Sequence, residues 1–144
     1  TCPDYAERKL LVILEDLIVD KSQIDHLNIV GHSYGGTLVA GLADETTAVT
    51  MSIHTVAAPM MPYERLINRC ANFNGYENMT ISNDLFQWRT VKEEDGAFKN
   101  MAVDPQIANI PNSTVIELPP QFKDGRRLGH NWSISWVIDN IFED

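Results

Sequence analysis

Ser33 is the residue of this chain best suited to covalent chemistry, because it stands in the sequence Gly-His-Ser-Tyr-Gly-Gly at residues 31–36. The pattern G-x-S-x-G is typical of a nucleophile elbow, a sharp strand-to-helix turn that lifts a serine hydroxyl clear of a sheet. The apolar stretch 27–30 predicts a buried strand before the turn, and residues 37–43 predict a helix after it. Gly31 and Gly35 are expected to be required at this turn, because strand and helix nearly collide there and leave no room for a Cβ.

Residues 29–36, Ile-Val-Gly-His-Ser-Tyr-Gly-Gly, resemble the elbow of the α/β-hydrolase family. A histidine before the serine and a double glycine after it are similar to the lipase and esterase branches. The resemblance implies one α/β-hydrolase-like domain over residues 1–144, corresponding to the C-terminal part of the family's fold and lacking its N-terminal strands. It also implies a serine hydrolase that cleaves carboxylic esters, acyl lipids among them, through an acyl-enzyme and without a cofactor.

A serine hydroxyl is a weak nucleophile at neutral pH and needs a base, which in turn needs an orienting acid. The family resemblance implies the chain order serine, acid, histidine. His130 follows Gly129 in a loop before the terminal helix, where the resemblance places the base. His32 adjoins the serine and is expected to point away from its hydroxyl, while His26 and His54 lie before or within strands.

The acid is expected after the third strand, and Asp95 fits this position best because the strand ends shortly before it and Gly96 follows. Four other carboxylates stay open as alternatives: Asp84, Glu93, Glu94 and Asp104. The backbone N–H of Tyr34 is expected to be one oxyanion donor. The family's second donor comes from a loop upstream of the elbow, and this chain has no such loop.

The bulk properties exclude several classes of function. A formal net charge of -9 over 144 residues argues against binding to nucleic acid or to anionic membrane surfaces, since both require basic patches. No apolar run approaches the length of a membrane span. Cys2 and Cys70 can form one disulfide or remain thiols, and no residue spacing suggests a metal site. A small-molecule ester or acyl compound is the expected partner, and both cytoplasmic and exported locations remain open.

Hydrophobic periodicity predicts an α/β fold, a parallel sheet of about four strands with flanking helices. The expected strands are 24–30, 49–58, 85–91 and 114–118, and the expected helices are 5–19, 37–43, the start of 62–78, and 131–142. Asp4 is expected to cap the first helix, with Glu7 completing a capping box. Its expected buried face is Leu10, Ile13, Leu14, Leu17 and Ile18. Six residues, Met60, Met61, Tyr63, Leu66, Ile67 and Phe73, are expected either to line an acyl pocket or to pack a crossover helix.

The first strand raises a question of its own, because residues 27–30 would form an exposed, apolar sheet edge of a kind that soluble proteins avoid. A second chain or a second copy of this chain is therefore expected to cover it. The alternative function is a non-catalytic module that binds a partner through this open edge.

Overall fold

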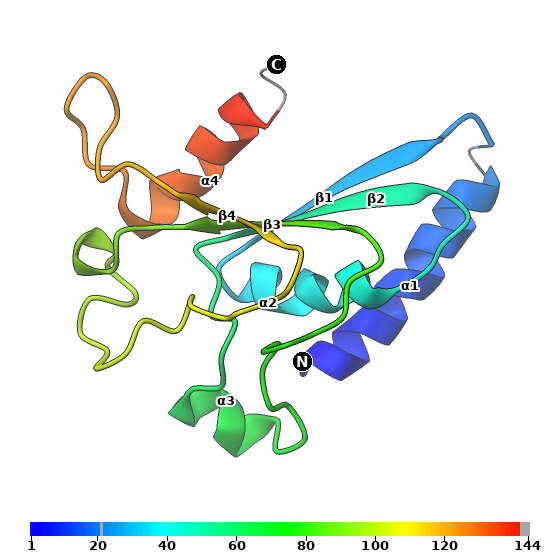
Figure 1. Ribbon diagram of the computed structural model, residues 1–144, viewed down its shortest axis with the longest axis horizontal. Helices are drawn as coiled ribbons and strands as arrows, with labels where there is room; N and C mark the ends of the chain where they lie inside the picture. Colours follow the sequence, from blue (N-terminus) through cyan, green and yellow to red (C-terminus); the bar gives the residue numbers. More distant parts are fainter. Residues whose placement is uncertain (21, 142–144) are drawn as a thin grey trace.

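The computed structural model describes residues 1–20 and 22–141 and shows an α/β fold, with helices on both faces of one four-stranded parallel sheet (Figure 1). The α-helices are α1 (Pro3–Asp20), α2 (Tyr34–Ala40), α3 (Glu64–Arg69) and α4 (Gly129–Asn140). The strands are β1 (His26–His32), β2 (Thr50–Val56), β3 (Asp84–Arg89) and β4 (Thr114–Glu117), and two 3-10 helices are η1 (Gly41–Asp44) and η2 (Lys92–Glu94). The predicted fold class and four strands are thus confirmed.

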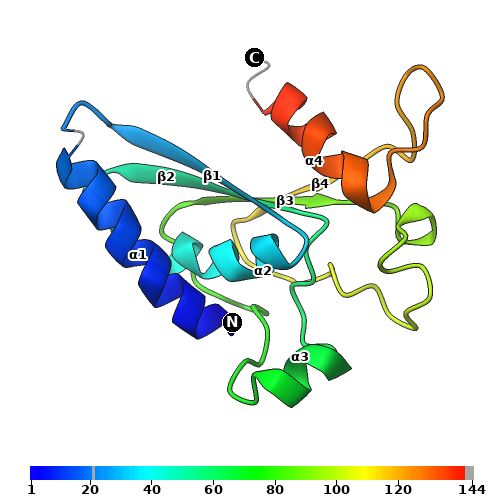
Figure 2. The same cartoon turned by 180° about the vertical axis from the view of Figure 1, so that it is seen from behind.

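The strands follow one another across the sheet in the order β1-β2-β3-β4, and every neighbouring pair is parallel. Helices α1 and α2 lie on one face and α4 lies on the other, as the two opposite views show (Figures 1 and 2). In a parallel sheet all carboxyl ends meet at one edge, where α/β proteins build their sites. The segments that follow β1 and β3 therefore begin at the same edge.

Each face of the sheet has its own apolar core, because successive side chains of a strand point to opposite faces. On β2, Met51 and Ile53 belong to the larger cluster, which Val39 of α2 joins. Val56 belongs to the second cluster, together with Trp88 and Val137 of α4. The two clusters fix α2 and α4 against opposite sides of the same strands.

Helix α1 differs from its sequence-based description at both its start and its buried face. It begins at Pro3, and the Ala6 N–H donates to the carbonyl of Cys2 at 3.0 Å, so the capping box based on Asp4 is wrong. Ile13 and Leu17 are 62% and 38% exposed. They are exposed because α1 packs against α2 and η1, which bury a narrow stripe that includes Leu10 and Leu14.

Strand β1 lies at the edge of the sheet and pairs with β2 alone among the described residues. Leu27 and Ile29 are only partly buried, against the cluster on the α2 face. Within residues 1–20 and 22–141, no helix has both the length and the apolar character needed to cross a membrane.

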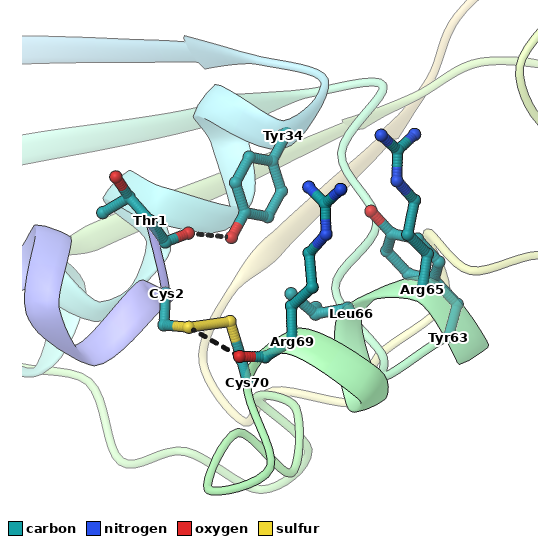
Figure 3. A pocket seen from close by; sticks show the side chains of 8 residues that line it. All are labelled: Thr1, Cys2, Tyr34, Tyr63, Arg65, Leu66, Arg69 and Cys70. Carbon is teal, nitrogen blue, oxygen red and sulfur yellow. Dashed lines mark hydrogen bonds between the residues drawn. A yellow bond between two sulfur atoms is a disulfide. The ribbon is translucent and has the colours of Figure 1, made fainter.

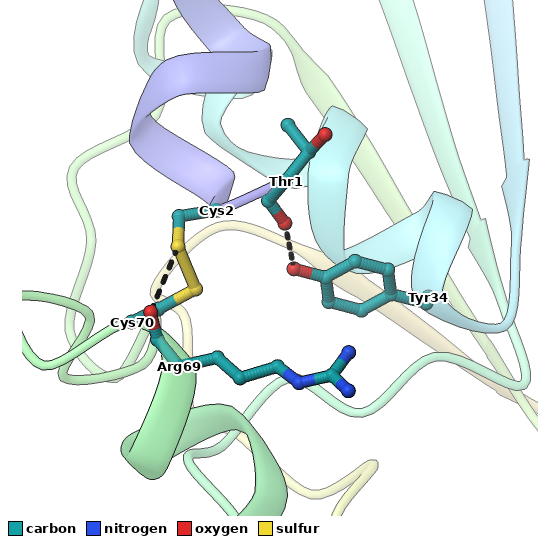
Figure 4. Close-up of a disulfide and its surroundings, with 5 residues drawn as sticks. All are labelled: Thr1, Cys2, Tyr34, Arg69 and Cys70. Carbon is teal, nitrogen blue, oxygen red and sulfur yellow. Dashed lines mark hydrogen bonds between the residues drawn. A yellow bond between two sulfur atoms is a disulfide. The ribbon is translucent and has the colours of Figure 1, made fainter.

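A disulfide between Cys2 and Cys70 decides the open question about the two cysteines (Figure 4). It joins the start of α1 to the residue that follows α3, across 68 positions of sequence. Only Leu66 of α3 is buried. The covalent link is therefore a main anchor of this short helix.

Candidate active site

Ser33 occupies the turn between β1 and α2 in a backbone conformation that non-glycine residues rarely adopt, with φ 54° and ψ -129°. Such a conformation costs about 1–3 kcal/mol and persists only where the surroundings impose it. Here the Ser33 N–H donates to the carbonyl of Val56 at 2.8 Å, and the Ser33 carbonyl accepts the Gly36 N–H at 2.9 Å. The strained turn that the G-x-S-x-G pattern indicates is thus present at Ser33.

The close approach of strand and helix at this turn depends on Gly31 and Gly36. A Cβ on Gly31 would lie 2.4 Å from the carbonyl oxygen of Gly35, and one on Gly36 would lie 2.5 Å from the Cβ of Ala58. A Cβ on Gly35 would have no heavy atom within 4 Å. The expectation for Gly31 is confirmed, whereas the one for Gly35 is wrong, because position 35 faces open space and position 36 faces the sheet.

His130 lies between Ser33 and Asp95, and its imidazole contacts both. Its Nε2 is 2.9 Å from the Ser33 hydroxyl oxygen, and its Nδ1 is 2.9 Å from both carboxylate oxygens of Asp95. The residue stands in the first turn of α4 rather than in the preceding loop, because α4 already begins at Gly129. Phe98 packs edge-on against the imidazole, with ring centroids 5.1 Å apart. One hydrogen-bonded chain therefore joins hydroxyl, imidazole and carboxylate.

Asp95 is completely buried and is held by several donors besides His130. Its carboxylate accepts the N–H groups of Ala97 at 2.8 Å and Phe98 at 3.2 Å, and it also accepts the Thr90 hydroxyl. Burial alone would raise the pKa of Asp95, but hydrogen bonds from His130, Thr90 and Ala97 outweigh it and lower the pKa. The carboxylate is thus kept ionised beside the imidazole, as an orienting acid requires.

The four alternative carboxylates take other positions. Asp84 begins β3, at the end of the sheet opposite Ser33. Asp104 accepts the backbone N–H of Gln106 at 3.0 Å and so stabilises a turn. Glu93 and Glu94 lie in η2, and Glu94 is 3.5 Å from the guanidinium of Arg127. Of the five carboxylates considered from the sequence, Asp95 is the one that contacts His130.

His32 has a contact that sequence reasoning did not find. Its Nε2 donates to the backbone carbonyl of His130 at 2.8 Å, and the two imidazole centroids are 5.0 Å apart. Burial lowers the pKa of His32, partly opposed by this hydrogen bond, so the ring is held in its neutral form. His32 is therefore a positioning residue for His130; its place beside the elbow serine was the one available signal. The other two histidines lie elsewhere, His26 beside Ser52 and His54 beside Trp88.

A cavity of about 330 Å³ opens beside the Ser33 hydroxyl. Its lining is Ser33, Tyr34, Pro59, Tyr63, Arg65, Ala97, Phe98, Met101 and Pro105. Six residues were expected from the sequence either to line an acyl pocket or to pack a crossover helix, and of these Tyr63 alone lines this cavity. Met61 and Phe73 pack against the core cluster on the α2 face. Met60 is instead in the core, at 1% exposure, and Ile67 is half exposed. The difference arises because the segment after η2, which carried no periodic pattern, folds over the serine.

The Tyr34 N–H lies at the first position of α2, directly after Ser33, and finds no acceptor among the described residues. In the same part of the chain, no group of three or more His, Cys, Asp or Glu side chains is arranged to hold a metal ion. Comparisons with protein-family models, with curated proteins and with solved structures each find no match. The geometry of the site is therefore the basis for any assignment.

Proposed function

We propose that this chain is an α/β-hydrolase-like serine hydrolase that cleaves carboxylic esters through an acyl-enzyme intermediate. The observation that carries the proposal is the chain of hydrogen bonds from the Ser33 hydroxyl through His130 to the buried Asp95. Three residues from distant parts of the sequence meet in the order and the geometry that activate a serine. A cavity whose lining is largely apolar, with Arg65 on one wall, adjoins the serine and offers room for an acyl or alcohol group.

In the acylation step, the Ser33 oxygen attacks the ester carbonyl while its proton passes to Nε2 of His130. Asp95 keeps the opposite nitrogen protonated and stabilises the imidazolium that forms. The Tyr34 N–H donates to the oxyanion of the tetrahedral intermediate. His130 then returns the proton to the departing alcohol, and the Ser33 ester remains. In the second half, His130 removes a proton from water while the water oxygen attacks the acyl carbon, and the proton then passes to the Ser33 oxygen as its bond to the acyl carbon breaks and the acid leaves.

The direct test replaces Ser33 by alanine and uses Ser82→Ala, an exposed serine two residues before β3, as the matched control. Hydrolysis of p-nitrophenyl butyrate and labelling by a fluorophosphonate probe are measured. Ser33→Ala is expected to lose several orders of magnitude in rate and all labelling, because removal of a triad nucleophile leaves only residual catalysis. Ser82→Ala is expected to match the wild type. Labelling that persists in Ser33→Ala would refute the assignment.

The second candidate function is a partner-binding module, and the open edge of β1 is the observation that favours it. An unpaired edge is a template for another strand, supplied by a different chain or a second copy. Sedimentation over a range of concentrations, combined with hydrogen exchange of β1, tests this role. A purely monomeric chain with rapidly exchanging β1 amides would argue against it. Fluorophosphonate labelling separates the two functions, since a module without catalysis has no activated serine.

A further inference from the structure

A second cavity, of about 350 Å³, shares part of its lining with the one at Ser33. Figure 3 shows the side chains that line this second cavity. Tyr34, Tyr63 and Arg65 line both cavities, so the two are continuous along one wall. The remaining lining of the second cavity is Thr1, Cys2, Leu66, Arg69 and Cys70. A substrate held at Ser33 can therefore extend past Tyr34 into a space bounded by α3.

This second cavity contains two arginines and none of the chain's carboxylates in its lining. Arg65 and Arg69 are four residues apart on α3, so their side chains leave the same face of the helix. Figure 3 shows both guanidinium groups directed to the same side as the Tyr34 ring. The ion pairs of the described residues include neither arginine. Both cations are thus available to an external anion.

The contacts of Tyr34 place the positive charge of Arg69 close to the passage between the two cavities. The Tyr34 hydroxyl donates to the carbonyl of Thr1, which fixes the ring between the two cavities. Burial and the nearby Tyr63 raise the pKa of Tyr34, and the positive charge of Arg69 opposes that increase. Figure 4 shows Arg69 extending from the disulfide toward the Tyr34 ring. Leu66 at 3% exposure and the Cys2–Cys70 disulfide hold the helix that presents both arginines.

We propose that Arg65 and Arg69 bind a carboxylate or phosphate group of the substrate, so that the ester cleaved at Ser33 is an anion. The inference rests on the proposed function and adds the chemical class of its substrate. Guanidinium groups match the oxygens of both anions through paired N–H donors. The net charge of the chain is -9, so a cavity lining with two arginines and no carboxylate departs from the average charge of the protein.

The first experiment compares two p-nitrophenyl esters with five-carbon acyl chains, the pentanoate and the monoglutarate, which differ by a terminal carboxylate. The ratio of kcat/KM for monoglutarate to that for pentanoate is expected to fall about tenfold in Arg65→Gln and in Arg69→Gln, the loss typical of one hydrogen bond to a charged group. Arg126→Gln is the control, because it removes the same charge from the segment between β4 and α4, and Arg126 lines neither cavity. Its ratio is expected to equal that of the wild type.

The second experiment needs no catalysis. The Nε–H signals of the arginines are followed in ¹⁵N-labelled wild-type protein during separate titrations with glutarate and inorganic phosphate. Shifts of the Arg65 and Arg69 signals with glutarate alone assign the site to carboxylates, and shifts with phosphate alone assign it to phosphate-bearing substrates. Unchanged signals with both anions at millimolar concentration, or an equal fall of the ratio in Arg126→Gln, would overturn the proposal. If neither ester is hydrolysed, the proposed function fails, and the titration still decides whether the anion site exists.

Discussion

The serine site and the α3 segment are neighbours that are held in place by different means. At the serine site, Asp95 is inaccessible to solvent and accepts hydrogen bonds from a histidine, a hydroxyl and two backbone amides. Helix α3 has six residues, one buried side chain and a covalent link at its end. The groups proposed to react are thus positioned by a buried polar network, whereas the groups proposed to select the substrate stand on a short helix that is held by a disulfide.

The largest effect is expected where the polar network itself is broken. Asp95→Asn replaces a carboxylate that accepts the Nδ1–H of His130 by an amide whose NH₂ group can donate to Nδ1. The imidazole is then held in the wrong tautomer, and kcat should fall about 10³- to 10⁴-fold. Asp104→Asn and Asp84→Asn remove the same charge away from His130 and should retain most of the activity. Ester hydrolysis by the three purified variants provides the measurement. A large loss of activity in Asp104→Asn, together with nearly normal activity in Asp95→Asn, would contradict the assignment of the acid.

Removing the Cys2–Cys70 disulfide should affect the α3 segment and leave the serine site largely unchanged. Cys70→Ser together with Cys2→Ser opens a loop of 68 residues and should lower the free energy of unfolding by about 2–4 kcal/mol. At a temperature where this variant remains folded, fluorophosphonate labelling of Ser33 should persist, because Ser33, Asp95 and His130 do not line the cavity beside the disulfide. The monoglutarate preference should fall, since α3 loses its anchor. Chemical denaturation and the two-ester ratio measure the two effects; equal loss of labelling and preference would show that the regions are not independent.

A pair of glycines tests how closely the elbow is packed. Gly36→Ala would place a Cβ 2.5 Å from that of Ala58 and 2.8 Å from the Gly31 carbonyl oxygen. Overpacking against strand and backbone should destabilise the protein by about 1–3 kcal/mol. Gly35→Ala enters open space inside α2 and should be neutral or stabilise by up to about 1 kcal/mol, because alanine favours a helix. Thermal unfolding of both variants is the measurement, and equal destabilisation would refute this view of the elbow.

The smallest effect concerns α1, which links the two regions through Cys2 and through its packing on α2. Burial, with a hydrogen bond to Glu45 and neighbouring carboxylates, raises the pKa of Glu7 from 4.5 to about 7. Between these values the folded protein binds more protons than the unfolded chain, so stability must fall as pH rises through this window. Glu7→Gln should remove that fall and add about 1–2 kcal/mol at pH 8. Glu15→Gln, an exposed change on the same helix, should leave the pH profile of unfolding unaltered.

Much of the architecture was predictable, because it depends on local sequence patterns. Four runs of apolar and β-branched residues indicated four strands, and alternation with helices indicated a parallel sheet. The elbow was predictable for the same reason, since a glycine-flanked serine between strand and helix restricts the backbone locally. Errors at Ile13 and Leu17 arose where periodicity gave the apolar face of α1 but not the extent of the surface available to cover it.

The sequence by itself determined which reactive groups are present: a serine in a strained turn, a histidine before the last helix, and several carboxylates near the third strand. The sequence favoured Asp95 but left four other carboxylates open, and the tertiary structure shows Asp95 in contact with His130, because the choice depends on which carboxylate is buried against Thr90 and α4. The tertiary structure alone decided the contact of His32 with His130, which are 98 residues apart, and the placement of two arginines beside Tyr34. Local patterns restrict backbone conformation, but the packing of whole elements decides which distant side chains meet.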